Sequence, residues 1–132
     1  MRIRIGSAAA GLALMASVTP LSAHHTIAAV YDVSKLVTLK GVVAEVDWRS
    51  PHSVFHLDVK NGDRTLVRWD VETKSPQGLR QMGLTQDFVK AGDAVTMDVF
   101  VAKDGTQHAA AETITSSTGT THISMLPRQP LH

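Results

Sequence analysis

Histidine dominates the residues of this chain that could do chemistry. The imidazoles stand at positions 24, 25, 52, 56, 108, 122 and 132. Cysteine is absent, which excludes a disulfide framework, a thiolate nucleophile and a zinc or iron–sulfur site with cysteine ligands. A metal ion would therefore need ligands from histidine, from carboxylates or from a terminal amine.

The pair His24-His25 follows a segment that has the pattern of a signal peptide. Arg2 and Arg4 precede an apolar stretch over residues 8–16, and Pro20-Leu21-Ser22-Ala23 follows it. The apolar stretch is shorter than the roughly 20 residues that span a bilayer. We therefore predict that residues 1–23 are removed after Ala23, with a cut after Ser22 as the alternative. The mature chain is expected to be periplasmic or secreted, without a transmembrane segment.

Cleavage after Ala23 would make His24 the first residue of the mature chain. A free α-amine and the imidazole of the same residue can chelate one metal ion, and another imidazole completes a roughly planar nitrogen set that suits copper(II). Cleavage after Ser22 would give Ala23-His24-His25, and a histidine in third place also favours square-planar copper or nickel. The competing interpretation is a solvated terminus without a metal role.

His52 is the candidate for the additional imidazole. Pro51 has a fixed φ and biases Ser50 towards extended conformations, so His52 enters its strand from a defined corner. His56 lies about 13 Å farther along the same strand, too far to share a mononuclear site with His52. We expect His56 to be a surface or cross-strand residue, and the remaining histidines have no informative spacing. The predicted metal ligands are thus His24, His25 and His52.

Neither the carboxylates nor any motif predicts a reaction, so we expect no enzymatic activity and no cofactor besides copper or another transition metal. Asp70 and Glu72 share an outward strand face, which is typical of solvated charges. Glu72 precedes the Ser75-Pro76 corner, where a pocket could open, and Trp48 and Trp69 are the aromatic candidates for such a ligand pocket. Their competing interpretation is core packing.

The segments that must position these residues are short and β-rich. Alternating patterns predict strands over residues 37–48, 53–60, 65–73, 94–102 and 107–114, and a short helix over residues 77–82 with Ser75 as its cap. Asn61-Gly62 predicts a tight hairpin. Gly41 predicts a bulge or sharp bend in the first strand, on which Val42, Val46 and Trp48 share one face.

This order favours a mainly β fold, a small five-stranded antiparallel OB-like barrel over residues 24–115 with one short helix between the third and fourth strands. The competitor is an open antiparallel sheet or small sandwich with one helix packed on it. Residues 116–132 are expected to be a loosely held tail. Hydrophobic residues make up 43% of the chain and charged residues 19%, a balance typical of one globular domain. Removal of Arg2 and Arg4 changes the net charge from +1 to −1, so the mature chain has no excess of positive charge of the kind that favours nucleic-acid binding.

Several segments together resemble a family of small exported bacterial proteins known only as a domain of unknown function. The resemblance covers residues 24–114. Family members typically read His-His-Ser at the start and Asn-Pro-His at the corner, where this chain has Thr26 and Ser50. The resemblance implies export and the domain limits and leaves the activity open. The matching segments are His24-His25-Thr26, Gly41-Val42-Val43 leading to Asp47-Trp48, Ser50-Pro51-His52, Trp69-Asp70-Val71-Glu72, Ser75-Pro76 with Gly78-Leu79, and Lys90 to Val95.

Two functions of different classes follow. The first is binding or delivery of a metal ion, copper above all, through His24, His25 and His52. The second is an OB-type module of the cell envelope that binds a small ligand, such as a cell-wall saccharide, or another envelope protein. A purely structural envelope component is the third alternative.

Overall fold

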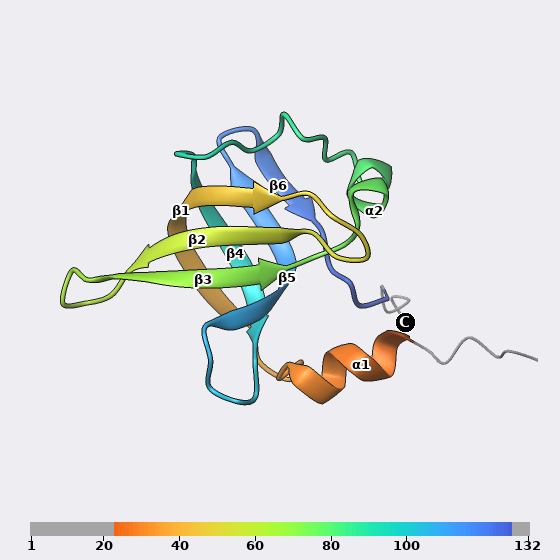
Figure 1. The fold of residues 1–132 in the computed structure, drawn as a ribbon, viewed down its shortest axis with the longest axis horizontal. Coiled ribbons are helices and arrows are strands. Elements are labelled where there is room, and N and C mark those ends of the chain that lie inside the picture. The colour runs from red at the N-terminus through yellow and green to blue at the C-terminus, as the bar shows by residue number, and fades with distance from the viewer. Residues whose placement is uncertain (1–22, 128–132) are drawn as a thin grey trace, which may run out of the picture.

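The computed structural model describes residues 23–127 as a closed barrel with two short helices (Figure 1). Residues 1–22, which hold nearly all of the predicted signal peptide, and residues 128–132, which include His132, lie outside the described residues. Within the described part, no helix has the length and apolar character needed to cross a membrane. The elements are α1 (Ala23–Val30), β1 (Val37–Asp47), β2 (Val54–Lys60), β3 (Leu66–Glu72), α2 (Pro76–Gln81), β4 (Ala94–Val101), β5 (His108–Ser116) and β6 (Gly119–His122).

Strands β1 to β5 close into a mixed barrel. The sheet order is β3-β2-β1-β4-β5-β6, and a pairing between β3 and β5 completes the ring. That pairing is parallel, from Asp70 opposite His108 to Glu72 opposite Ala110, whereas the other pairs are antiparallel. The prediction of a purely antiparallel barrel is therefore wrong. Up and down directions cannot alternate around a ring with an odd number of strands, so one neighbouring pair must be parallel.

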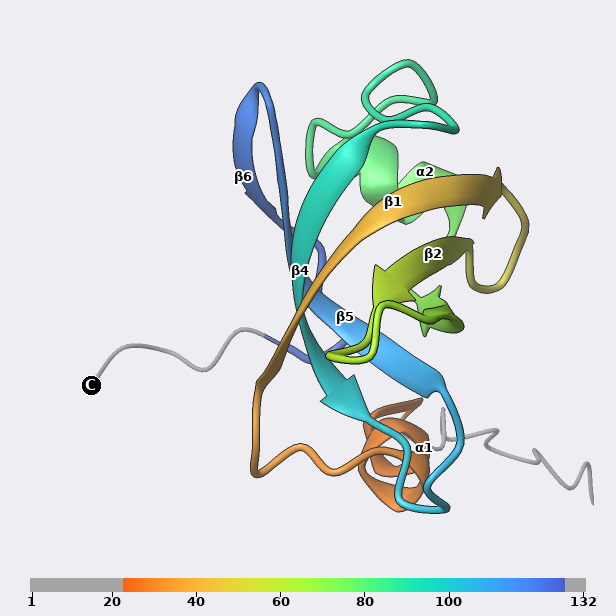
Figure 2. The same cartoon turned by 90° about the vertical axis from the view of Figure 1, so that its left-hand side faces the viewer.

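Strand β1 is curved along its length (Figure 2), and its residue Gly41 pairs with a neighbouring strand on each edge. Its partners are Val59 on β2 and Val95 on β4. A Cβ atom at this position would lie 2.8 Å from the backbone oxygen of Asp58, which is closer than real Cβ atoms approach. Glycine is thus needed here for the close approach of two backbones.

The bulge in β1 lies between Val43 and Glu45, after the predicted position at Gly41. An extra residue in a strand exchanges the faces on which the following side chains lie. Val43 is buried before the bulge, and Val46 and Trp48 pack against the core after it. Val42 therefore lies on the outer face and is 44% exposed, so the prediction that it shares a face with Val46 and Trp48 is wrong.

The hairpin of β2 and β3 confirms the predicted alternation. Phe55, Leu57 and Val71 are fully buried, and His56 and Asp70 alternate with them on the outer face. The connection is longer than the tight turn that Asn61-Gly62 predicts. It runs over residues 61–65, and its residue with positive φ is Arg64 at 68°.

Two segments outside the ring complete the core. The Ser75 side chain caps α2 as predicted by accepting a hydrogen bond from the Gly78 amide, and Leu79 on that helix is fully buried. Beyond Ser116, where the sequence predicts a loose tail, β6 pairs with β5 and Ile123 is fully buried. The buried Thr73 hydroxyl donates to the Ile123 carbonyl at 2.8 Å. This part of the tail is held because the barrel leaves apolar surface for Ile123 to cover.

Helix α1 packs beside the connection between β4 and β5 (Figure 1). The backbone amide of Lys103 donates to the Val30 carbonyl, and the Lys103 ammonium donates to the Ala28 carbonyl. Ile27 and Tyr31 are buried in a small second core. That core also contains Phe100, Ala102 and Ala110, with Met125 and Leu126 packed against it.

Candidate functional site

A polar cavity of about 400 Å³ lies on the outer face of β2 and β3. The connection between β1 and β2 borders it, as do the first residue of β5 and the residue that follows α1. Histidines and carboxylates from four segments of the chain therefore meet in one place. The lining residues are Tyr31, Arg49, Ser50, Pro51, His52, Val54, His56, Asp70, Glu72 and His108.

The Glu72 carboxylate contacts two different side chains in this cavity. One carboxylate oxygen, Oε1, pairs with Nδ1 of His52. The other, Oε2, accepts a hydrogen bond of 2.6 Å from the Tyr31 hydroxyl. Burial raises the pKa of the Tyr31 phenol, and the hydrogen bond to Glu72 and its negative charge raise that pKa further. The phenol therefore stays protonated and acts as a donor.

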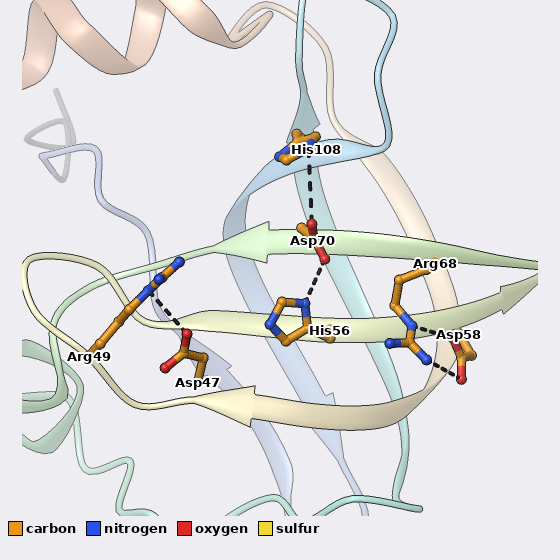
Figure 3. Close-up of polar contacts among 7 residues, drawn as sticks. All are labelled: Asp47, Arg49, His56, Asp58, Arg68, Asp70 and His108. Atoms are coloured by element: carbon orange, nitrogen blue, oxygen red, sulfur yellow. Dashed lines mark hydrogen bonds and ion pairs between the residues drawn. The ribbon is translucent and has the colours of Figure 1, made fainter.

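A second carboxylate, Asp70, lies between two further histidines (Figure 3). Its Oδ1 atom is 2.6 Å from Nδ1 of His56, and its Oδ2 atom is 4.0 Å from Nε2 of His108. The three residues stand in register across β2, β3 and β5, because Asp70 is the direct partner of both histidines. Asp70 and Glu72 share the outward face of β3 and are partly exposed, as expected, and each also contacts an imidazole, which the sequence did not predict.

The two carboxylates orient the rings of His52 and His56 so that one nitrogen of each ring is available to a ligand. His52 and His56 each direct Nδ1 to a carboxylate, so Nε2 is the nitrogen that can take a metal ion or accept a hydrogen bond. A carboxylate on the second nitrogen fixes the ring and raises its basicity, as in many metal sites. Among the side chains that the structure describes, which do not include those of His24 and His25, no three histidine, aspartate or glutamate residues are grouped so that they could hold a metal ion.

The structure brings together only part of the predicted site. His52 and Glu72 are in contact, but Trp48 and Trp69 do not line their cavity. Both tryptophans pack against the main core, and Trp48 meets Phe55 edge to face with ring centroids 6.1 Å apart. His24 and His25 belong to the first turn of α1, and their side chains lie outside the described residues.

The sequence analysis missed Tyr31, His56, Asp70 and His108 as members of this cavity. A tight two-residue turn at Asn61-Gly62 would pair His56 with Val67. The longer connection instead pairs Lys60 with Leu66 and thereby His56 with Asp70. His108 reaches Asp70 through the pairing of β3 with β5, and no local sequence pattern predicts that pairing.

Two arginine–aspartate pairs lie on the same surface as His56 and Asp70 (Figure 3), and Arg49 of one pair also lines the cavity. Arg49 Nε lies 3.2 Å from a carboxylate oxygen of Asp47. Arg68 donates two hydrogen bonds to Asp58, at 2.6 and 3.2 Å, and they hold the pKa of Asp58 below its usual value. Along the outer face, this pair separates the histidine cavity from the end of the hairpin.

Comparisons with known proteins establish a family but no activity. Searches of curated proteins and of solved structures find no match. Residues 12–111 match a family of unknown function, DUF6152, and this range contains every residue that lines the cavity. The match extends over most of the 132 residues, so the chain belongs to the DUF6152 family of unknown function.

Proposed function

We propose that this protein is exported and binds a transition metal ion, copper(II) above all, in the cavity at Glu72. The ligands are the imidazole of His52 and the histidines His24 and His25 of the mature terminus. The observation that carries the proposal is the contact of His52 Nδ1 with Glu72, which orients Nε2 for a metal ion. Export follows from the signal-peptide pattern of residues 1–23.

The position of α1 supports a shared site. Tyr31, directly after this helix, donates to the same carboxylate that holds His52. Met125 packs in the small core beside Ile27 of α1, and it also lines a shallow hollow with His52. At about 1.5 Å per residue, the first turn of α1 lies about 10 Å along the helix axis from Tyr31. These contacts support the proposal that the mature terminus and His52 share one site.

The role we propose is binding or delivery rather than catalysis. Both carboxylates of the cavity already contact imidazoles, so they act as orienting groups. A set of nitrogen ligands from imidazole and a terminal amine favours copper(II) over calcium or magnesium, which prefer oxygen ligands.

The test is a copper(II) titration of protein exported and processed by its own signal, with intact mass confirming His24 as the first residue. One-to-one binding is expected. His52→Ala should weaken the affinity by about a hundredfold through loss of a ligand, and Glu72→Gln by about tenfold through loss of orientation. His122→Ala is the matched control, because His122 lies on β6 beside Glu112, outside the cavity, and should leave affinity unchanged.

The dependence on the terminus is tested separately with His24→Ala. It should weaken copper binding as strongly as His52→Ala does. Binding that depends on His24 and is indifferent to His52 would show a simple terminal chelate and would refute the shared site. Binding should also weaken at acid pH, since protons compete for the imidazole nitrogens.

A second function is favoured by the place of the cavity in the barrel. We infer that the barrel is OB-like, because it closes through β3 and β5 and has α2 between β3 and β4. OB barrels bind ligands on the face of their second and third strands, beside the connections that border this cavity. The alternative is therefore a module for a small polar ligand or another envelope protein, without a metal role. The packing of both tryptophans against the core argues against an aromatic sugar platform.

The alternative is tested by chemical-shift changes on adding N-acetylglucosamine oligomers to metal-free protein. Saturable changes centred on His56 and His108, together with copper binding that ignores His52, would support the saccharide module over the metal site. Absence of such changes would remove this class of saccharide.

A further inference from the structure

A second and larger cavity, of about 690 Å³, lies at the far end of the β2–β3 hairpin. It is formed on the outer face by β1, β4, the hairpin and the end of β5, and Asp58, which pairs with Arg68, lines it one outward position along β2 from His56 of the histidine cavity. Its volume is within the range of about 300–1,000 Å³ that is typical of small-molecule sites. The proposed metal function makes no use of it.

The lining of this cavity includes two large apolar side chains that the fold leaves in contact with solvent, here called its apolar floor. Val42 is 44% exposed and Leu66 is 61% exposed. They are far apart in sequence, but Val42 pairs with Asp58 on β2, and Leu66 pairs with Lys60 one outward position farther along the same strand. Exposed apolar side chains that gather in a hollow mark a surface available for an apolar ligand.

The rim of the cavity is positively charged. Lys40 and Lys60 line it, and within the described part of the chain neither ammonium lies within 4.0 Å of a carboxylate. The one carboxylate of the lining, Asp58, is held by two hydrogen bonds from Arg68. The charge available to a ligand is therefore cationic.

We propose that this cavity binds an anionic amphiphile with a single acyl chain, such as a free fatty-acid carboxylate. The chain would cover Val42 and Leu66, where burial of apolar surface supplies the affinity. The carboxylate would pair with Lys40 and Lys60, which supplies the selection of an anionic head group. A neutral or cationic amphiphile gains only the first of these contributions.

Calorimetric titration of metal-free processed protein with laurate, below its micelle concentration, tests the proposal. Saturable one-to-one binding is expected. Leu66→Asp should weaken it at least tenfold by placing a carboxylate on the apolar floor, and the double variant Lys40→Glu/Lys60→Glu should do the same by reversing the rim charge. Lys90→Glu is the matched control, because Lys90 lies outside the cavity and should leave affinity unchanged.

Further variants and a cationic ligand serve as controls for this titration. Leu66 is mostly exposed, so Leu66→Asp should keep the unfolding transition of the parent protein, and Val42→Ser is a milder second variant. Dodecyltrimethylammonium has an alkyl chain of similar length to that of laurate and the opposite charge, and it should bind at least tenfold more weakly. The proposal is overturned if laurate does not bind, if the cation binds equally well, if neither floor variant has an effect, or if only anionic phospholipid vesicles are bound. His52→Ala should leave laurate binding intact, which separates this site from the metal proposal.

Discussion

Tyr31→Phe tests whether the hydrogen bond from Tyr31 to Glu72 stabilises the packing of α1 on the barrel. The substitution removes one hydroxyl and keeps the ring in place. Tyr31 is only 5% exposed, and its hydroxyl donates to Glu72 at 2.6 Å. The aromatic packing in the small core should survive, so the change isolates one hydrogen bond to a carboxylate.

The magnitude follows from the acceptor and its exposure. A hydrogen bond to a charged group contributes about 1.5–3 kcal/mol to stability. The side chain of Glu72 is 30% exposed, so water can hydrate the oxygen that loses its partner, which favours the lower end. We expect the free energy of unfolding to fall by about 1.5 kcal/mol. In a domain of this size the midpoint of thermal unfolding should drop by about 6 °C or more.

The assay is urea unfolding followed by tryptophan fluorescence, with Glu72→Gln and the double variant completing a cycle. A coupling free energy of about 1 kcal/mol is expected between the two sites. Amide hydrogens of residues 27–31 should exchange faster in Tyr31→Phe, because the end of α1 is released. Thr120→Val, which deletes an exposed contact with the Thr115 hydroxyl, is the control and should change stability by less than about 0.5 kcal/mol.

A loss below about 0.3 kcal/mol in Tyr31→Phe, together with a coupling near zero, would refute the reasoning. Glu72 would then hold His52 without help from α1. The structural link between the helix and the proposed metal site would be lost.

Three further predictions concern the barrel and its single tyrosine. Gly41→Ala should destabilise the protein by about 1–3 kcal/mol, since its Cβ would meet the Asp58 backbone at 2.8 Å, whereas Gly62→Ala, with no atom within 4 Å, should be neutral or slightly stabilising in urea unfolding. Ile123→Ala should cost about 2–4 kcal/mol in the same assay, because this side chain is fully buried. In absorbance at 295 nm, Tyr31 should ionise above the ordinary value of about 10, and Glu72→Gln should bring its pKa down. Because folding raises this pKa, the associated stability is complete below about pH 10 and is lost as the pH rises through the folded value.

The strand faces were predictable where alternation runs without interruption. Phe55, Leu57 and Val71 are buried as their spacing indicates, because successive side chains of a strand point to opposite sides. Ser75 was likewise predictable as the cap of α2, since its hydroxyl needs only the nearby Gly78 amide. These features depend on neighbours within a few residues.

The position of the bulge in β1 and the length of the hairpin loop could not be predicted by the same reasoning. An extra residue between Val43 and Glu45 reverses which side chains face the core, and alternation alone does not indicate where it is inserted. The Asn61-Gly62 pair correctly predicts a reversal, but the loop length sets the register. That register decides whether His56 meets Asp70 or a valine.

By itself the sequence determined the strand segments and the chain reversals between them, and it indicated His52 and Glu72 as candidate site residues, because these follow from local spacing and turn chemistry. Only the tertiary structure decided that His52 contacts Glu72, that Tyr31 shares that carboxylate and that Asp70 lies between His56 and His108. Those contacts join residues on separate strands and on α1. They arise from the closure of a ring of five strands through the parallel pair β3 and β5, which no local pattern encodes.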